Sequence, residues 1–165
     1  MRHAQAADHA ATDPGSDAAR PLSARGRRDA EAAGRLLAQR REAPALALVS
    51  TAQRTRDTWQ ALCAGMGATP EVWFDRTLYD AGPPAVVELL AAVEAGVQSV
   101  LVVGHNPTIS IAASAFSDGQ AAAEHETVLA DGMPSAAMAW FDVPVQWEDV
   151  NARRLRLTGV DVPRD

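Results

Sequence analysis

Apolar residues recur along this chain with two spacings, one typical of helices and one typical of strands. Ala32, Ala33, Leu36 and Leu37 form a stripe at helical spacing behind Ser23, a residue type suited to cap a helix. Stripes of this kind predict helices over residues 24–41, 52–66, 84–95 and 108–116. Short continuous apolar runs predict strands over residues 45–49, 71–74, 99–103, 136–142 and 154–160.

These elements alternate along the chain, which indicates the α/β class. Alternation predicts a three-layer α/β/α sandwich with a mostly parallel sheet and right-handed crossovers. The run 99–103 is continuously apolar and rich in valine, so we expect an inner strand that is buried on both faces. Residues 117–131 are polar and rich in alanine, a pattern compatible with either a mobile loop or a short helix.

The chain has the length of one domain, and we expect residues 1–165 to fold as a single unit. A chain of this class normally begins with a strand, yet Arg2 and His3 directly follow Met1. We therefore expect the first strand to be missing or to lie upstream of Met1.

Composition and charge exclude several functions. The net charge is −6 and all fifteen basic residues are arginines, so the chain offers no broad basic face to nucleic acid and no lysine for P-loop or Schiff-base chemistry. The single cysteine, Cys63, excludes an internal disulfide and a cysteine-built zinc site. No apolar run approaches the ~20 residues of a membrane-spanning helix, and no signal-peptide pattern follows Met1. We expect a cytoplasmic protein with neither a membrane nor a nucleic-acid partner.

Three polar segments carry the candidate chemistry. They are Arg2-His3-Ala4 at the start, residues 50–58, and Gly104-His105-Asn106-Pro107, and each of the last two directly follows a predicted strand. In open α/β sheets ligands bind outside the carboxyl ends of the strands, so the three segments are expected to converge on one site.

The residue types in these segments favour an anionic, tetrahedral ligand. The guanidinium group of an arginine can bind two phosphate oxygens at once, and a neutral imidazole can attack phosphorus. We therefore expect His3, Arg2, Arg54 and His105 to surround one phosphate site. Asn106 is a further phosphate-binding candidate, although its side chain can instead cap the next helix.

A metal site is a weaker alternative. His3, His9 and His105 lack a carboxylate or cysteine at ligand spacing, and two nearby arginines would repel a divalent cation. We expect neither a metal nor another cofactor.

The ordered set of motifs resembles the histidine phosphatase superfamily, also called phosphoglycerate-mutase-like, and within it the short SixA-type phosphohistidine phosphatases. The matching motifs occur in the family's order: Arg2-His3-Ala4, Arg20-Pro21-Leu22-Ser23 with Gly26, Ser50 with Arg54 and Thr58, Leu78-Tyr79, Val103-Gly104-His105-Asn106-Pro107, and the small-residue strand 134–141.

This resemblance implies a metal-independent phosphatase with a phosphoglycerate-mutase-like fold. His3 would be the nucleophile that forms a phosphohistidine, Arg2 and Arg54 would clamp the phosphoryl oxygens, and His105 would stabilise charge in the transition state. The attacking nitrogen of His3 must be unprotonated, so its other nitrogen is expected to donate to a backbone carbonyl or a carboxylate.

The general acid is where this sequence departs from the wider family, in which many members carry a glutamate between the second arginine and the second histidine. Asp80, which follows Leu78-Tyr79, is the only carboxylate of that interval that we place near the site. Arg20 either reaches the rim of the site or pairs with Asp17.

The lack of a clear acid favours a phosphohistidine substrate, because an imidazole leaving group can depart already protonated. About 45 residues separate Thr55 from Val100, and predicted elements fill most of them, which leaves no room for the helical lid of larger superfamily members. An open site suits a phosphorylated protein. Two alternatives remain: a small phosphate ester as substrate, or a non-catalytic phosphate-binding domain.

Overall fold

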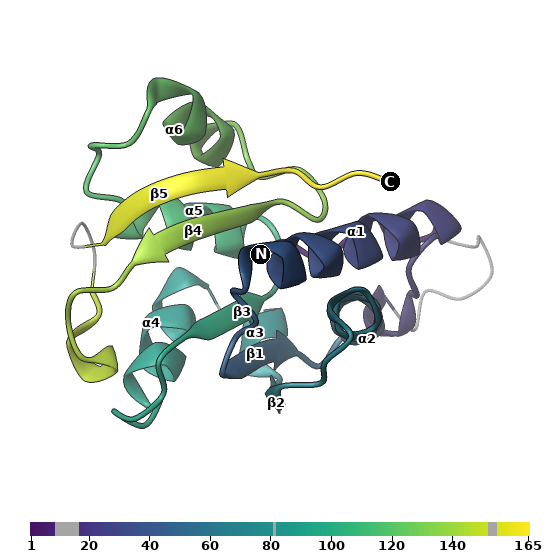
Figure 1. Ribbon diagram of the computed structural model, residues 1–165, viewed down its shortest axis with the longest axis horizontal. Coiled ribbons are helices and arrows are strands. Elements are labelled where there is room, and N and C mark those ends of the chain that lie inside the picture. Colours follow the sequence, from purple (N-terminus) through teal and green to yellow (C-terminus); the bar gives the residue numbers. More distant parts are fainter. Residues whose placement is uncertain (9–16, 81, 152–154) are drawn as a thin grey trace.

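The computed structural model of the protein describes residues 1–8, 17–80, 82–151 and 155–165 (Figure 1). Three strands form a parallel sheet in the order β2-β1-β3, and two more form an antiparallel pair. The strands are β1 (Leu46–Ser50), β2 (Glu71–Asp75), β3 (Val100–Val103), β4 (Met138–Asp142) and β5 (Arg156–Asp161).

Helices connect and cover these strands. They are α1 (Ala24–Arg40), α2 (Gln53–Met66), α3 (Thr77–Asp80), α4 (Pro83–Ala91), α5 (Thr108–Phe116) and α6 (Ala123–Ala130), with 3₁₀ turns at Asp17–Ala19 and Trp147–Asp149. Among the described residues, none of the helices combines the length and the apolar character needed to cross a membrane.

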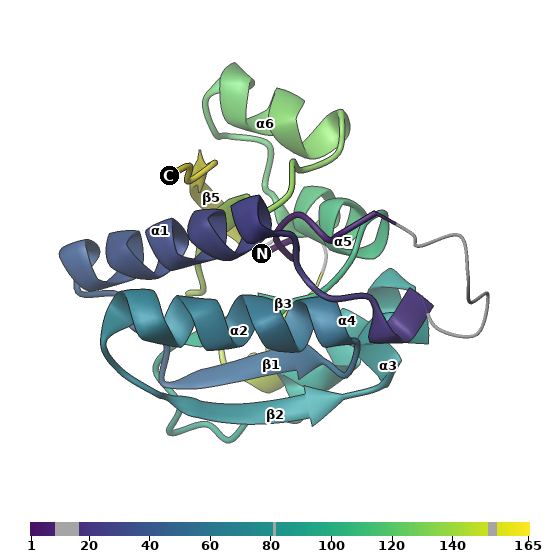
Figure 2. The ribbon, with the colours of Figure 1, turned by 90° about the vertical axis from the view of Figure 1, so that its right-hand side faces the viewer.

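Strand β1 separates two hydrophobic clusters, because successive side chains of a strand point to opposite faces. Ala47 and Val49 pack with buried residues of α1 and α2, whereas Leu46 and Leu48 pack with buried residues of α4 and α5. Figure 2 shows α1 and α2 stacked on one side of β1 and β2. The three-layer α/β/α architecture expected from the sequence is confirmed.

The segment Met1–Ala4 lies between the end of β3 and the residues that precede β4. Gly104 N donates to Met1 O at 3.1 Å and His3 N donates to Gly104 O at 2.9 Å, so this segment runs parallel to the end of β3. On its other side, Ala136 N donates to His3 O at 3.1 Å. The backbone of His3 is therefore fixed on both sides.

Burial of the strands differs from the expectation in one respect. The inner strand of the order β2-β1-β3 is β1, all of whose residues are buried, whereas β3 is an outer strand and its residues 100–102 are only half-buried. The prediction that 99–103 is an inner strand buried on both faces was therefore wrong. Strand β3 also borders a cavity of about 880 Å³, whose lining includes residues 100–102 and residues 138–142 of β4. The expectation of a first strand that is missing or upstream of Met1 stays a prediction.

Other local predictions can be compared with the structure. Ser23 caps α1 by accepting from Gly26 N at 2.9 Å, as its residue type indicates. Residues 117–131 contain α6, so the short-helix alternative is correct. The helix expected over 84–95 already ends at Ala91. The last strand begins at Arg156, and the predicted start of this strand at Arg154 lies outside the described residues.

Candidate active site

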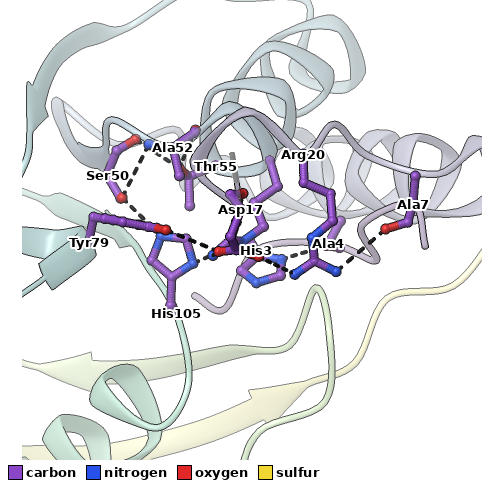
Figure 3. A network of polar contacts seen from close by, with 11 residues as sticks. His3, Ala4, Ala7, Asp17, Arg20, Ser50, Ala52, Thr55, Tyr79 and His105 are labelled. Atoms are coloured by element: carbon purple, nitrogen blue, oxygen red, sulfur yellow. Dashed lines mark hydrogen bonds and ion pairs between the residues drawn. The ribbon is translucent and has the colours of Figure 1, made fainter. Parts of the chain in front are cut away.

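The predicted site residues lie at the carboxyl end of the parallel sheet. Arg54 stands in the first turn of α2 directly after β1, His105 follows β3, and His3 lies on the segment that pairs with the end of β3. The His3 and His105 rings have centroids 5.1 Å apart, and Arg54 Nε donates to His105 Nδ1 at 3.2 Å. The structure thus brings together three side chains, each about fifty residues from the next along the sequence. Figure 3 shows both histidines at this end of the sheet.

His3 is held in one tautomer. Its Nδ1 lies 2.7 Å from the carbonyl oxygen of Ala4, and because a carbonyl only accepts, Nδ1 carries the proton and Nε2 keeps its lone pair. Burial lowers the pKa of His3 from 6.5 to about 4, and the charges of Arg54 and Arg2 act in the same direction. His3 is therefore neutral at pH 7, with an unprotonated nitrogen available for attack. Its partner is the backbone carbonyl that the sequence left unidentified.

Thr58 fixes this part of the chain against α2. The Ala4 N–H donates to Thr58 Oγ1 at 3.0 Å, and the same hydroxyl donates to Arg54 O at 2.6 Å. Gly26 allows the neighbouring segment to approach, since a Cβ at this position would lie 2.0 Å from Gln5 O. Thr58 and Gly26, which both match the family motifs, therefore help to hold His3 in place.

His105 is held in the opposite tautomer. Its Nδ1 accepts from Arg54 Nε, so its Nε2 carries the proton and lies 2.9 Å from Ser50 Oγ. Burial lowers the pKa of His105 to about 3, with the charge of Arg54 as the next cause. Both histidines of the site are consequently neutral, and arginines supply its positive charge.

Arg2 and Asn106 share one acceptor at the side of the site. Arg2 Nη1 donates to Met133 O at 2.8 Å and Asn106 Nδ2 donates to the same oxygen at 3.0 Å. Asn106 Oδ1 accepts from Ser110 Oγ at 2.7 Å, so the amide contacts the protein at both ends. The alternative that Asn106 caps α5 was wrong, because the cap position is occupied by Pro107 and no side chain bonds there.

Asp17 is the residue of this region that the sequence reasoning missed. Its Oδ2 lies 2.9 Å from Arg54 Nη2 and accepts from Tyr79 OH at 3.1 Å, and its Oδ1 lies 3.0 Å from Arg20 Nη2. Its backbone oxygen accepts from Arg54 Nη1 at 2.7 Å. Figure 3 shows Asp17 and Arg20 grouped with the two histidines. The open choice for Arg20 is thereby resolved, since it pairs with Asp17 at the rim.

Asp80, the acid candidate chosen from the sequence, lies elsewhere. Its carboxylate forms an exposed ion pair with Arg76 at 3.0 Å. The preceding residue, Tyr79, points inward instead, with its ring edge-on to His105 at a centroid distance of 5.4 Å. The signal that identifies Asp17 is its position three residues before Arg20, at the start of the Arg-Pro-Leu-Ser motif.

The arrangement suits a phosphoryl dianion. Arg2, Arg20 and Arg54 contribute three positive charges, Asp17 contributes one negative charge, and the histidines are neutral. Arginines of this kind stabilise the charge of a transferring phosphoryl group without a metal. No group of three or more histidine, cysteine or acidic side chains in the described part of the chain is placed to hold a metal ion, and His9 lies outside that part.

Known proteins of similar sequence and structure identify the family. Residues 1–80 match the model of the histidine phosphatase superfamily, branch 1. A solved structure from Agrobacterium tumefaciens, proposed to be the phosphohistidine phosphatase SixA, is 32% identical with a TM-score of 0.81 over 99% of this chain and 95% of that one. The chain belongs to the histidine phosphatase superfamily.

Two further relatives agree. A proposed SixA from Nakamurella multipartitia is 31% identical with a TM-score of 0.80 over 99% of this chain and 93% of that one. The uncharacterized protein Rv1276c of Mycobacterium tuberculosis is 36% identical over 99% of this chain and 100% of its own length. The resemblance stated from the motifs is confirmed, and the protein is a phosphatase of the SixA type.

Proposed function

We propose that this phosphatase works without a metal, with His3 Nε2 as the nucleophile, and that its substrate is a phosphohistidine carried on another protein. The observation that carries the proposal is the hydrogen bond from His3 Nδ1 to Ala4 O, which leaves Nε2 unprotonated beside the Arg54–His105 pair. A nucleophile of lowered pKa next to fixed positive charge is the arrangement that phosphoryl transfer needs.

The reaction has two steps. In the first, Nε2 of His3 forms a bond to phosphorus while the bond between phosphorus and the leaving group breaks, and the bonding pair goes to the leaving group. Arg2 and Arg54 offset the charge on the phosphoryl oxygens. In the second step, water adds its oxygen to phosphorus, the bonding pair of the P–N bond returns to His3 Nε2, and both protons of the water leave with the phosphate.

Two features support a protein substrate. The chain between α2 and β3 forms β2, α3 and α4 in its described residues, and α4 is packed on α5 in the hydrophobic core rather than above His3. The two similar structures at 31% and 32% identity are both proposed to be phosphohistidine phosphatases. A site over which the described residues between α2 and β3 place only the short helix α3 would admit a side chain presented by a folded protein, and it would offer little binding area to a small ester.

The test compares substrates. We expect kcat/KM for a phosphohistidine-containing protein to exceed that for sugar phosphates by orders of magnitude, and we expect chelators to have no effect. Quenching during turnover is expected to trap a phosphoenzyme that is labile in acid. Comparable efficiencies on sugar phosphates would reject the protein substrate, and a reaction that chelators stop would reject the metal-independent mechanism.

A further inference from the structure

We infer that Asp17 selects the leaving group. Its carboxylate accepts a hydrogen bond from the ring N–H of the substrate's phosphohistidine, and so favours departure of an imidazole over departure of an alkoxide. This inference rests on the proposed function, since it names the residue that distinguishes phosphohistidine from a phosphate ester in that same site.

The first observation behind this inference is the position of Asp17. His3 is a buried residue, whereas Asp17 is half-buried and its side chain is 40% exposed, so Asp17 lies nearer to solvent, at what we call the mouth of the site, and His3 lies at its floor. In an in-line transfer the leaving group stands opposite the nucleophile across the phosphorus. A substrate that enters from solvent therefore places its leaving group at the mouth, where Asp17 is held by Arg20, Arg54 and Tyr79.

The second observation is that Asp17 is ionised. Partial burial opposes its charge, but the hydrogen bond from Tyr79 and the charges of Arg54 and Arg20 outweigh it and lower the pKa of the carboxyl below its usual range. At neutral pH the side chain is a carboxylate, which accepts hydrogen bonds and has no proton to give. It can therefore stabilise a protonated ring, but it cannot protonate the alkoxide of a sugar phosphate.

The third reason for the inference is the way in which the leaving group departs. A phosphohistidine ring that is protonated on the nitrogen not bonded to phosphorus releases a neutral imidazole: the P–N bond breaks, its electron pair stays on the ring nitrogen, and the proton remains where it was. An unprotonated ring would have to leave as an anion. A carboxylate hydrogen-bonded to the ring N–H favours the protonated form, because charge-assisted hydrogen bonds are about twice as strong as neutral ones.

The experiment compares Asp17→Asn and wild type on two substrates. One is a phosphohistidine peptide, and the other is p-nitrophenyl phosphate, whose leaving group needs no proton. We expect Asp17→Asn to lower kcat/KM for the peptide by roughly 10- to 100-fold, the range of a lost hydrogen bond to a charged group, and to change kcat/KM for p-nitrophenyl phosphate by less than about threefold. Asp17→Glu is expected to recover part of the peptide activity. Asp80→Asn, which removes the exposed carboxylate on α3, is the matched control and is expected to change neither.

The pH profile gives a second readout. In the wild type, kcat for the peptide falls at high pH as the substrate ring loses its proton, and in Asp17→Asn this decline is expected to begin at lower pH. Among the described residues, the titratable groups close to Asp17 are His3, His105, Tyr79, Arg20 and Arg54. Of these, His3 and His105 are already neutral, and the pKa of Tyr79 is raised by burial and by its hydrogen bond to Asp17, so none of the three changes charge as the substrate ring titrates.

The outcomes separate the inference from the proposed function. An equal loss on both substrates would show that Asp17 only positions Arg54, and a gain on both would show that it competes with phosphate for Arg54. Either result overturns the inference and leaves His3 chemistry intact. If wild-type protein hydrolyses p-nitrophenyl phosphate but no phosphohistidine, the proposed substrate is wrong and the inference fails with it.

Discussion

At the floor of the site, His3 and His105 are each 8% exposed, and each is held in one tautomer by a fixed partner: the Ala4 carbonyl accepts from His3 Nδ1, and Arg54 Nε donates to His105 Nδ1. At the mouth, the Asp17 side chain is 40% exposed and is held by ion pairs with Arg20 and Arg54. The floor thus relies on burial and on buried hydrogen bonds, whereas the mouth relies on charges that water partly screens.

This difference separates two tasks of a phosphatase. In the proposed mechanism every phosphoryl substrate contacts the floor, so a change there is expected to affect all substrates alike. Only the leaving group would contact the mouth, so a change there is expected to depend on the substrate. Arg54 belongs to both regions, because its guanidinium contacts His105 at the floor and Asp17 at the mouth.

The largest effect is expected at the floor. His3→Ala is expected to abolish turnover on every phosphoryl substrate and to remove the acid-labile phosphoenzyme, because no other group in the proposed mechanism supplies the attacking atom. Single-turnover assays with the phosphohistidine peptide and p-nitrophenyl phosphate measure it. His125→Ala, which changes a half-buried histidine of α6, is the control. Near-wild-type activity in His3→Ala would refute the nucleophile assignment.

Arg54→Ala tests the residue shared by both regions. Removing a preorganised charge donor typically costs about 10²- to 10³-fold in kcat, and we expect a loss of that size on both substrates. Arg54→Lys is expected to recover only part of the activity, since an ammonium cannot reproduce the planar fork. Arg56→Ala, on the same helix but exposed and packed over Phe74, is the matched control and is expected to retain full activity. A loss below about threefold in Arg54→Ala would exclude this residue from the transition state.

Ser50→Ala is expected to have a smaller effect. The change leaves the buried Nε2–H of His105 without its acceptor, which costs about 1–3 kcal/mol in stability or in the positioning of the ring. We expect kcat/KM to fall by roughly 3- to 10-fold, equally for both substrates, because the change is confined to the floor. A loss that differs between the two substrates would contradict the division between floor and mouth.

A change of pH is expected to have the smallest effect on turnover, and it tests most directly whether the two histidines are neutral. Ring signals of His3 and His105 in nuclear magnetic resonance are expected to titrate near pH 4 and pH 3 rather than near 6.5. A folded-state pKa below the unfolded value means that the unfolded chain binds more protons between these values, so stability falls as pH decreases through this window. Between pH 7 and pH 5 the loss is expected to be about 1–2 kcal/mol for each histidine, measured by urea unfolding, and His3→Ala is expected to reduce it. A titration midpoint near 6.5 in the folded protein would show that the rings are not held neutral.

The secondary structure was predicted well where the pattern is long or the turn chemistry is strong. The Ser23 cap and the buried strand at 45–49 are both observed. Helix α3 was not predicted, because the four residues Thr77–Asp80 are too short to show a period. The burial of β3 was mispredicted because a valine-rich run indicates strand formation, but only its neighbours decide how much of it is covered.

The candidate site was also predicted only in part. Residues at strand ends could be placed together from the sequence because the carboxyl ends of parallel strands meet at one edge of a sheet. The contact of Asp17 with Arg54 could not be predicted, because Asp17 lies on a 3₁₀ turn 37 residues away, and its spacing of three residues from Arg20 indicates only their local ion pair. Asp80 was chosen for following Leu78-Tyr79, but Tyr79 points inward and Asp80 outward on the same short helix.

The sequence by itself determined the α/β class, the family, and the residue types that would meet at the site, since these depend on periodicity and on motifs in a fixed order. Only the tertiary structure decided which carboxylate stands at the mouth, which nitrogen of each histidine carries a proton, and that both rings are neutral. These properties depend on burial and on partners brought together through space, such as Ala4 O for His3 and Arg54 Nε for His105, and no spacing along the chain encodes them.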